Sequence, residues 1–243
     1  MTADTRRERI DSQPPEVREG VRIFVRKQVV FLLILAALLF GVSGRLDWTW
    51  GWVQFVLYVL AVAGMIAAIL PVHPSLLAER ARLQPGTKKW DVVITMLAAS
   101  LLPIATWVVA ALDMRFGWQP DFSATVQIIA TVFWVLGYGL TIWAMRANAY
   151  FSATVRIQSE RDHRVATGGP YRFIRHPGYV GAIIFQLATP MMLGSPWGLI
   201  PSVLAALLYV VRTALEDRTL REELPGYEAY TRQTRYRLLP GVW

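Results

Sequence analysis

The segment from Gly168 to Gly181, GGPYRFIRHPGYVG, carries the residue types that a small-molecule site uses. It holds two Arg, one His and two Tyr, and its four Gly and two Pro interrupt regular helix. The Arg and His side chains can donate hydrogen bonds to an anion, and the Tyr rings offer aromatic faces. Because long apolar runs flank the segment, we expect it to form a polar site at the edge of a membrane domain.

A second polar group lies nearer the C-terminus. Arg212 and Glu216 are four residues apart, so they share one face of a helix. An exposed ion pair is one interpretation of that spacing. Ionisable residues at the end of a membrane span usually face the bundle interior or an aqueous cavity, however. We therefore expect Arg212 and Glu216, with Arg237 of the tail, to belong to the same pocket as the first segment.

The composition excludes several kinds of chemistry. The chain has no Cys and only three His, at positions 73, 163 and 176, so we expect no disulfide, thiolate site or protein-built metal centre. The net charge is +8, but the basic residues alternate with apolar runs and form no single patch, so nucleic acid is not an expected partner. With 54% hydrophobic residues in 243, the class is membrane protein.

Charge-free apolar runs predict the membrane spans. Four runs lie in the first part of the chain, at 28–44, 48–78, 92–112 and 122–145. The last run, 176–211, is too long for one span, and Pro and Gly residues between 189 and 197 break it. We predict an all-α integral membrane protein with about six transmembrane segments. Its last two form a tight helical hairpin, near 178–192 and 197–222, which either spans fully or is re-entrant.

The basic residues predict the orientation. Six crossings place 23 of the 25 Lys and Arg residues on one side of the membrane, which the positive-inside rule makes the cytosol. Both termini are then cytoplasmic, and the cofactor pocket faces the cytosol. The absence of Cys and the short spans suit a bacterial inner membrane.

The chain divides into three parts in this interpretation. Residues 1–27 form a cytosolic tail with a basic helix at the membrane interface, and 28–147 hold four transmembrane helices. Residues 148–243 form the catalytic region, which contains the hairpin and the C-terminal tail.

Ordered motifs in this last part resemble the isoprenylcysteine carboxyl methyltransferase family and, more widely, the phospholipid methyltransferases. These motifs are His163–Tyr171, Arg175–Gly181, Glu216, Tyr227-x-x-Tyr230 and Arg237-x-x-Pro240. The resemblance covers roughly 148–243 and implies an integral-membrane methyltransferase that depends on S-adenosylmethionine (SAM). Two departures concern the substrate: Leu215 precedes Glu216 where the family often has a second Glu, and Gly226 directly precedes Tyr227.

The resemblance and the chemistry of SAM together assign roles to residues. SAM presents a carboxylate, an ammonium, a sulfonium and an adenine, so its pocket needs donors, an anion and aromatic surface. The cofactor-binding candidates are His163, Tyr171, Arg175, His176, Pro177, Tyr179, Gly181, Glu216 and Tyr230. The catalytic candidates are Glu216, Arg212 and Arg237.

The methyl acceptor stays open at this point. A carboxylate acceptor is already ionised and needs only a cation to orient it, which Arg212, Arg235 or Arg237 can supply. An amine or thiol acceptor needs a base, for which Glu216 and His176 are the candidates. We expect a lipophilic or lipid-linked acceptor that arrives sideways from the bilayer while SAM arrives from the cytosol.

Two other function classes compete. Sterol and steroid reductases, which bind NADPH, share an Arg-His-Pro-x-Tyr-x-Gly motif with this chain. The chain lacks the Asp-Glu-x-x-Cys and Lys-Tyr-Gly-x-x-Trp elements expected of them. The second class, a non-enzymatic membrane scaffold, does not explain the polar segments.

Overall fold

The computed structural model describes residues 13–118 and 122–243, and every regular element in these ranges is helical. Five helices are long and apolar enough to cross a membrane, and a sixth apolar helix is shorter. The five are Pro15–Gly41, Thr49–Ile69, Lys89–Phe116, Ala124–Ala147 and Leu199–Glu223, and the sixth is Pro177–Leu193. The predicted fold class, an all-α membrane protein with about six apolar helices, is confirmed.

Two of the long helices contain a π-helical turn. The first consists of α2 (Pro15–Ala36) and η1 (Ala37–Gly41), and the third of α5 (Lys89–Met96), η2 (Leu97–Leu101) and α6 (Leu102–Phe116). The remaining elements follow in chain order. They are α3 (Thr49–Ile69), α4 (Pro74–Glu79), α7 (Ala124–Ala147), η3 (Ser159–Arg161), η4 (Gly169–Arg172), α8 (Pro177–Leu193), α9 (Leu199–Glu223) and α10 (Tyr227–Gln233).

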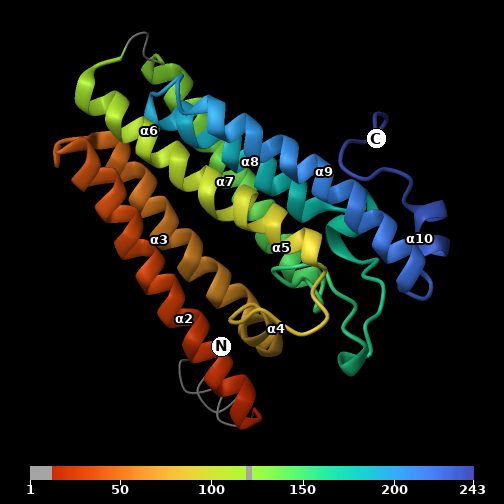
Figure 1. Ribbon diagram of the computed structural model, residues 1–243. Helices are drawn as coiled ribbons and strands as arrows, with labels where there is room; N and C mark the ends of the chain where they lie inside the picture. The colour runs from red at the N-terminus through yellow and green to blue at the C-terminus, as the bar shows by residue number, and fades with distance from the viewer. Residues whose placement is uncertain (1–12, 119–121) are drawn as a thin grey trace.

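The long helices run side by side, and the two ends of the bundle differ in composition (Figure 1). One end holds the short connections α2–α3 and α8–α9. The other holds the start of α2, helix α4, the segment 148–176 and the chain beyond α9. We call this second end the polar end, because the predicted site segments meet there.

The first helix begins at Pro15 and continues without a break through the first apolar run. The basic segment that we expected at the membrane interface is therefore the first part of this same helix, and residues 1–12 lie outside the described ranges. The helix packs closely on α4: a Cβ atom at Gly20 would lie 2.5 Å from the Cβ of Ala78. This contact brings α4 to the polar end beside α2.

The hairpin of α8 and α9 lies within two residues of its predicted bounds. Pro177 occupies the first turn of α8, where its missing N–H costs nothing, and Gly194 ends the helix with φ of 85°. The Oγ atom of Ser195 donates to Oδ2 of Asp113 at 2.5 Å and accepts from the N–H of Gly198 at 3.2 Å. The turn is thus fixed to the end of α6, and the two helices return to the polar end together.

A glycine contact sets the distance between α7 and α8. A Cβ atom at Gly181 would lie 2.4 Å from the carbonyl oxygen of Gly137, and one at Gly137 would lie 2.7 Å from the carbonyl oxygen of Gly181. The hydroxyl of Thr141 also donates to the carbonyl of Gly178 at 3.4 Å. Close approach of small residues is a usual way to pack helices within a membrane, where no hydrophobic force drives them together.

We predict that Gly181→Ala destabilises the bundle. The added methyl has no space between α7 and α8, and overpacking of this kind typically costs about 1–3 kcal/mol. Gly139→Ala on α7 is the matched control, because a Cβ atom there meets nothing within 4 Å. Thermal unfolding in detergent, followed by tryptophan fluorescence, should show a lower Tm for Gly181→Ala alone. Equal transition temperatures for the two variants would contradict this account of the helix contact.

Candidate functional site

A cavity of about 530 Å³ extends from the polar end into the middle of the bundle. Its volume lies in the range of roughly 300–1,000 Å³ that small-molecule sites occupy. Eight of the residues predicted for the site line it: His163, Tyr171, Arg175, His176, Tyr179, Arg212, Glu216 and Tyr230. Pro177, Gly181 and Arg237 are not among the lining residues. Pro177 starts α8, and Gly181 packs against α7.

The segment from Asn148 to Ala166 forms one wall of the cavity, and polar contacts hold it in place. Arg156 is buried, and its Nε atom donates to Oε1 of Glu79 on α4 at 2.7 Å. Its Nη2 atom donates to Oε1 of Glu160 at 2.5 Å. Gln158 is fully buried, and its amide donates to the carbonyl of Tyr150 at 2.8 Å. An irregular loop at this depth is stable because its polar groups find partners within the protein.

His163 is held in this wall as a neutral ring. It stacks on Tyr150 with ring centroids 4.5 Å apart, and its Nδ1 accepts the backbone N–H of Gln158 at 3.3 Å. Burial, with the charges of Arg161 and Arg156, lowers the pKa of His163 to about 4. At neutral pH the residue thus offers an aromatic face and one N–H donor, not a cation.

Asp217 is the centre of the largest polar cluster at the polar end. Its side chain has no solvent exposure and accepts two bonds from Arg175, from Nε at 2.7 Å and Nη2 at 3.2 Å. The Nε of Arg237 donates to it at 2.9 Å and the hydroxyl of Tyr227 at 3.1 Å. The Nε2 atom of His176 lies 3.3 Å from Oδ1 of Asp217. We call these five residues the Asp217 cluster.

The cluster fixes the C-terminal tail against the start of α8. The backbone N–H of Arg175 donates to the carbonyl of Tyr236 at 2.9 Å, and that of His176 donates to the carbonyl of Arg237 at 3.0 Å. The guanidinium of Arg237 also lies 4.8 Å from the ring centroid of Trp243. Arg237, predicted as a catalytic candidate, therefore contacts the protein's own carboxylate and tail outside the cavity.

Arg212 pairs with an acid that the sequence did not indicate. Its Nε donates to Oδ1 of Asp91 at 2.6 Å, and its Nη2 donates to Oδ2 at 3.0 Å. Asp91 has no solvent exposure and also accepts the backbone N–H of Val155 at 2.6 Å. Asp91 begins α5, so this pair joins α5, α9 and the wall segment. The Arg212 guanidinium lies 5.1 Å from the ring centroid of Tyr179.

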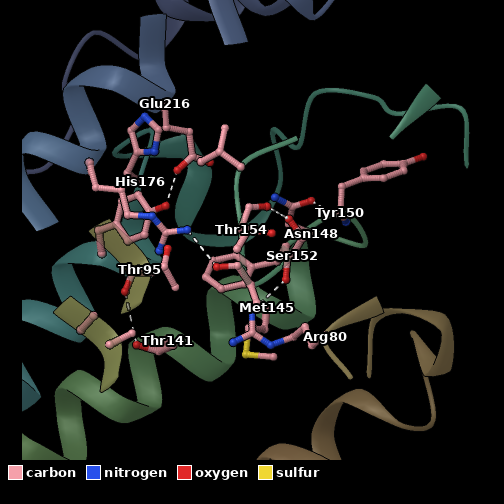
Figure 2. A pocket seen from close by; sticks show the side chains of 18 of the residues that line it. Arg80, Thr95, Thr141, Met145, Asn148, Tyr150, Ser152, Thr154, His176 and Glu216 are labelled. Carbon is pink, nitrogen blue, oxygen red and sulfur yellow. Dashed lines mark hydrogen bonds between the residues drawn. The ribbon is translucent and has the colours of Figure 1, made fainter. Parts of the chain in front are cut away.

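Glu216 faces the cavity with its charge available. It is the only acidic side chain among the lining residues in the described ranges. The hydroxyl of Tyr179 donates to its Oε2 atom, and the Tyr179 ring stacks on His176 with an interplanar angle of 5°. Figure 2 shows Glu216 and His176 on the same side of the pocket. This carboxylate can hold a cationic group or accept a proton.

Two tyrosines close the cavity near α10. The hydroxyl of Tyr230 donates to the carbonyl of Tyr171 at 2.7 Å, and the amide of Asn148 donates to the Tyr171 hydroxyl at 3.3 Å. Burial raises the pKa of Tyr171 and raises that of Tyr230 to about 12. Both hydroxyls therefore remain protonated at physiological pH and serve as hydrogen-bond donors.

Comparisons with known proteins match the part of the chain that builds this site. The model of the isoprenylcysteine carboxyl methyltransferase (ICMT) family matches residues 129–222. A protein-S-isoprenylcysteine O-methyltransferase of Schizosaccharomyces pombe is 27% identical over 164 residues, covering 60% of this chain and 68% of that protein. The protein-S-isoprenylcysteine O-methyltransferase B of Arabidopsis thaliana is 27% identical over 110 residues, covering 41% of this chain and 51% of that protein.

A third relative, the methanethiol S-methyltransferase of Pseudomonas deceptionensis, is 27% identical over 136 residues, covering 52% of this chain and 50% of that protein. Over residues 129–222 the chain resembles the ICMT family. The resemblance predicted from the motifs is thus confirmed, and the names of the relatives support methyltransferase as the enzyme class. The matched range runs from α7 into the last turn of α9. It includes Arg212, Glu216 and Asp217 and excludes Asp91, α10 and the tail.

We predict that Asp217→Asn loosens the C-terminal tail. The substitution leaves the buried guanidinium of Arg175 without a carboxylate, and breaking a buried ion pair typically costs about 3–5 kcal/mol. Glu222→Gln is the control, because Glu222 forms an exposed pair with Arg218. Thermal unfolding and trypsin cleavage within 234–243 measure the effect. Equal cleavage rates in the two variants would contradict the role of the Asp217 cluster.

The lowered pKa of His163 predicts a pH-dependent contribution to stability. The folded state resists protonation until the pH approaches about 4, whereas an unfolded chain takes up the proton near the ordinary value of 6.5. The contribution of neutral His163 is therefore complete above pH 6.5 and decreases as the pH falls through this window. We expect Tm to fall less steeply from pH 6.5 to 4 in His163→Gln than in the unaltered protein. Parallel curves would show that His163 is not held neutral.

Proposed function

We propose that this protein is an integral-membrane methyltransferase that uses SAM and methylates a lipophilic acceptor. One observation carries the proposal: a single cavity joins the polar residues around Glu216 to the aromatic interior of the bundle, at Tyr58 and Trp107. A polar, charged cofactor and an apolar acceptor can meet in such a space. The family that the chain resembles supports the same reaction class.

The residues at the polar end fit the chemical groups of SAM. Glu216 supplies an anion for its ammonium group, and the Tyr171 hydroxyl, which accepts from Asn148, can donate its proton to the carboxylate. The stacked rings of Tyr150 and His163 present an aromatic face for adenine, and neutral His163 adds no charge beside the sulfonium. When bound, SAM supplies an electrophilic methyl group on its sulfonium.

The protein's own contribution is orientation and the exclusion of water. Tyr179 holds the carboxylate of Glu216, and His176 supports the Tyr179 ring from the side of the Asp217 cluster. His176 directs Nε2 at Asp217, so Glu216 is the better base of the two candidates. An amine or thiol acceptor would therefore lose its proton to Glu216.

Carboxylate O-methylation is the reaction that we propose, because two of the relatives are named for O-methylation. A carboxylate needs no base, and it needs a cation that orients it. S- or N-methylation is the alternative, supported by the relative named a methanethiol S-methyltransferase. The excess of Lys and Arg at the polar end supports a cytosolic orientation of this end and of both termini. The absence of Cys and the short spans support a bacterial inner membrane. The acceptor then arrives from the bilayer.

We predict that Glu216→Ala and His176→Ala each weaken SAM binding at least about tenfold. The first removes the anion proposed for the SAM ammonium, and the second removes the ring that supports Tyr179. Glu222→Ala, an exposed acid on the same helix, should bind as the unaltered protein does. Isothermal titration with SAM, S-adenosylhomocysteine and NADPH measures the affinities. Near-normal affinity in both site variants would mean that the pocket lies elsewhere. Tight NADPH binding without SAM binding would favour the reductase alternative.

A further inference from the structure

The interior of the site cavity is not lined by hydrocarbon alone. Gln186, near the middle of α8, lines the cavity and is only 3% exposed. Three tyrosines, Tyr58, Tyr138 and Tyr209, line the same cavity, and their hydroxyls form no hydrogen bond with any residue that the structure describes. Polar groups inside a membrane bundle normally find partners within the protein. The partners of these groups must therefore come from what the cavity holds.

The amide of Gln186 has one orientation that satisfies its neighbours. Its Nε2 atom lies 3.5 Å from Oγ1 of Thr106 and 3.4 Å from Oγ of Ser202. The Thr106 hydroxyl donates its own proton to the carbonyl of Leu102 at 2.9 Å, and the Ser202 hydroxyl donates to the backbone carbonyl of Gln186 at 2.9 Å. Because a hydroxyl has one proton, both oxygens must accept from the amide. The NH₂ group therefore faces them, and the carbonyl oxygen Oε1 is directed away.

This carbonyl oxygen is free and accessible. No residue within the described ranges donates a hydrogen bond to Oε1 of Gln186. The atom is not sealed among packed side chains either, in contrast to both amide atoms of Gln54 on α3. Since Gln186 lines the site cavity, Oε1 faces that space. An unpaired amide carbonyl in apolar surroundings is unfavourable, and a ligand that places a donor there removes the penalty.

The helix sets the depth at which this acceptor atom lies. Tyr179 and Gln186 are seven residues apart on α8, so they share one face. Tyr179 holds Glu216 at the polar end, and the helical rise places Gln186 about 10 Å farther into the bundle. The amide also contacts Thr106, the neighbour of Trp107 in the aromatic interior. The free carbonyl thus lies in the part of the cavity that the proposed function gives to the acceptor.

We propose that Gln186 selects the methyl acceptor by accepting a hydrogen bond from a neutral donor, a hydroxyl or an amide N–H, in its lipophilic chain. The donor lies about 10 Å from the end that is methylated, as the helical rise between Tyr179 and Gln186 requires. The inference rests on the proposed function and narrows its acceptor to a lipid with such a group in the chain. A plain hydrocarbon chain leaves Oε1 unpaired. Thr106 and Ser202 do not line the cavity and act as positioning residues for the amide.

Binding of 10-hydroxydecanoate to the full-length protein in maltoside micelles, with S-adenosylhomocysteine present, tests the proposal by titration calorimetry. The comparison ligand is 10-methoxydecanoate, because its ether oxygen accepts a hydrogen bond but cannot donate one. Decanoate has neither function. The corresponding series of 10-hydroxydecylamine, 10-methoxydecylamine and decylamine covers an amine acceptor. The ligands differ in their partition into micelles, so the hydroxy-to-methoxy affinity ratio is compared between protein variants, where that difference cancels.

Three variants separate the free carbonyl from the rest of the helix. Gln186→Leu removes it. Gln54→Leu is the matched control, because it makes the same exchange at a fully buried amide that does not line the cavity. The double variant Thr106→Val, Ser202→Ala keeps Gln186 and removes the two oxygens that orient its amide.

We expect the hydroxy-to-methoxy affinity ratio to fall at least about tenfold in Gln186→Leu and to stay unchanged in Gln54→Leu. The double variant should lower the ratio as well, because its amide can turn the NH₂ group to the cavity and donate to the ether. S-adenosylhomocysteine affinity should be unaltered in all three, which verifies that each variant folds.

Several results would overturn the proposal. Equal ratios in the unaltered protein and Gln186→Leu, in both ligand series, would show that the carbonyl does not recognise a donor. If Gln186→Leu does not fold, an unchanged ratio in the double variant has the same meaning. Loss of S-adenosylhomocysteine binding in Gln186→Leu with an unchanged Tm would assign the carbonyl to the cofactor instead. If the unaltered protein binds S-adenosylhomocysteine but none of the six ligands, only this inference fails. If it binds no S-adenosylhomocysteine, the proposed function itself fails.

Discussion

The buried negative charge of Asp217 is the constraint on which the polar end depends. A carboxylate with no solvent exposure is stable only when cations and donors surround it. Its partners come from the start of α8, from α10 and from the tail. If one of these segments moved away, the buried carboxylate would lose a hydrogen-bond or ion-pair partner. The Asp217 cluster therefore links folding of residues 217–243 to formation of the site. The cluster also holds the end of the irregular segment 148–176 and the short C-terminal tail in fixed positions around the pocket.

The pair of Arg212 and Asp91 applies the same constraint across the middle of the chain. Its two residues are 121 positions apart, and both side chains are buried. The pair holds α5 against α9 and so ties the region 148–243 to the helices before it. The helices of the first half contribute lining residues to the cavity and a buried counter-ion for one of its central arginines.

The sequence predicts the helices well, because the physics that fixes them is local. Apolar runs and the Pro and Gly residues between 189 and 197 locate the hairpin to within two residues. The pairing of charges is not local, and there the prediction is incomplete. Spacing suggested Glu216 as the neighbour of Arg212, whereas the buried partner is Asp91, which lies just outside the charge-free run 92–112. Gly181 was assigned to the cofactor because it ends a motif, and no sequence pattern reports that two helix backbones touch there. Asp217 carried one signal, an acid beside Glu216 on a helix with Arg221 one turn later.

The distribution of buried ion pairs also separates two tasks within one cavity. Where Arg175, Arg212 and Arg156 are neutralised by the protein's own acids, they stiffen the walls and are not free to select a ligand. Glu216 is the one acidic side chain that lines the cavity within the described ranges, and none of these three arginines pairs with it. Two of the three pairs, Arg212–Asp91 and Arg156–Glu79, join the matched range 129–222 to residues that precede it, so the walls of the cavity depend on acids from outside that range.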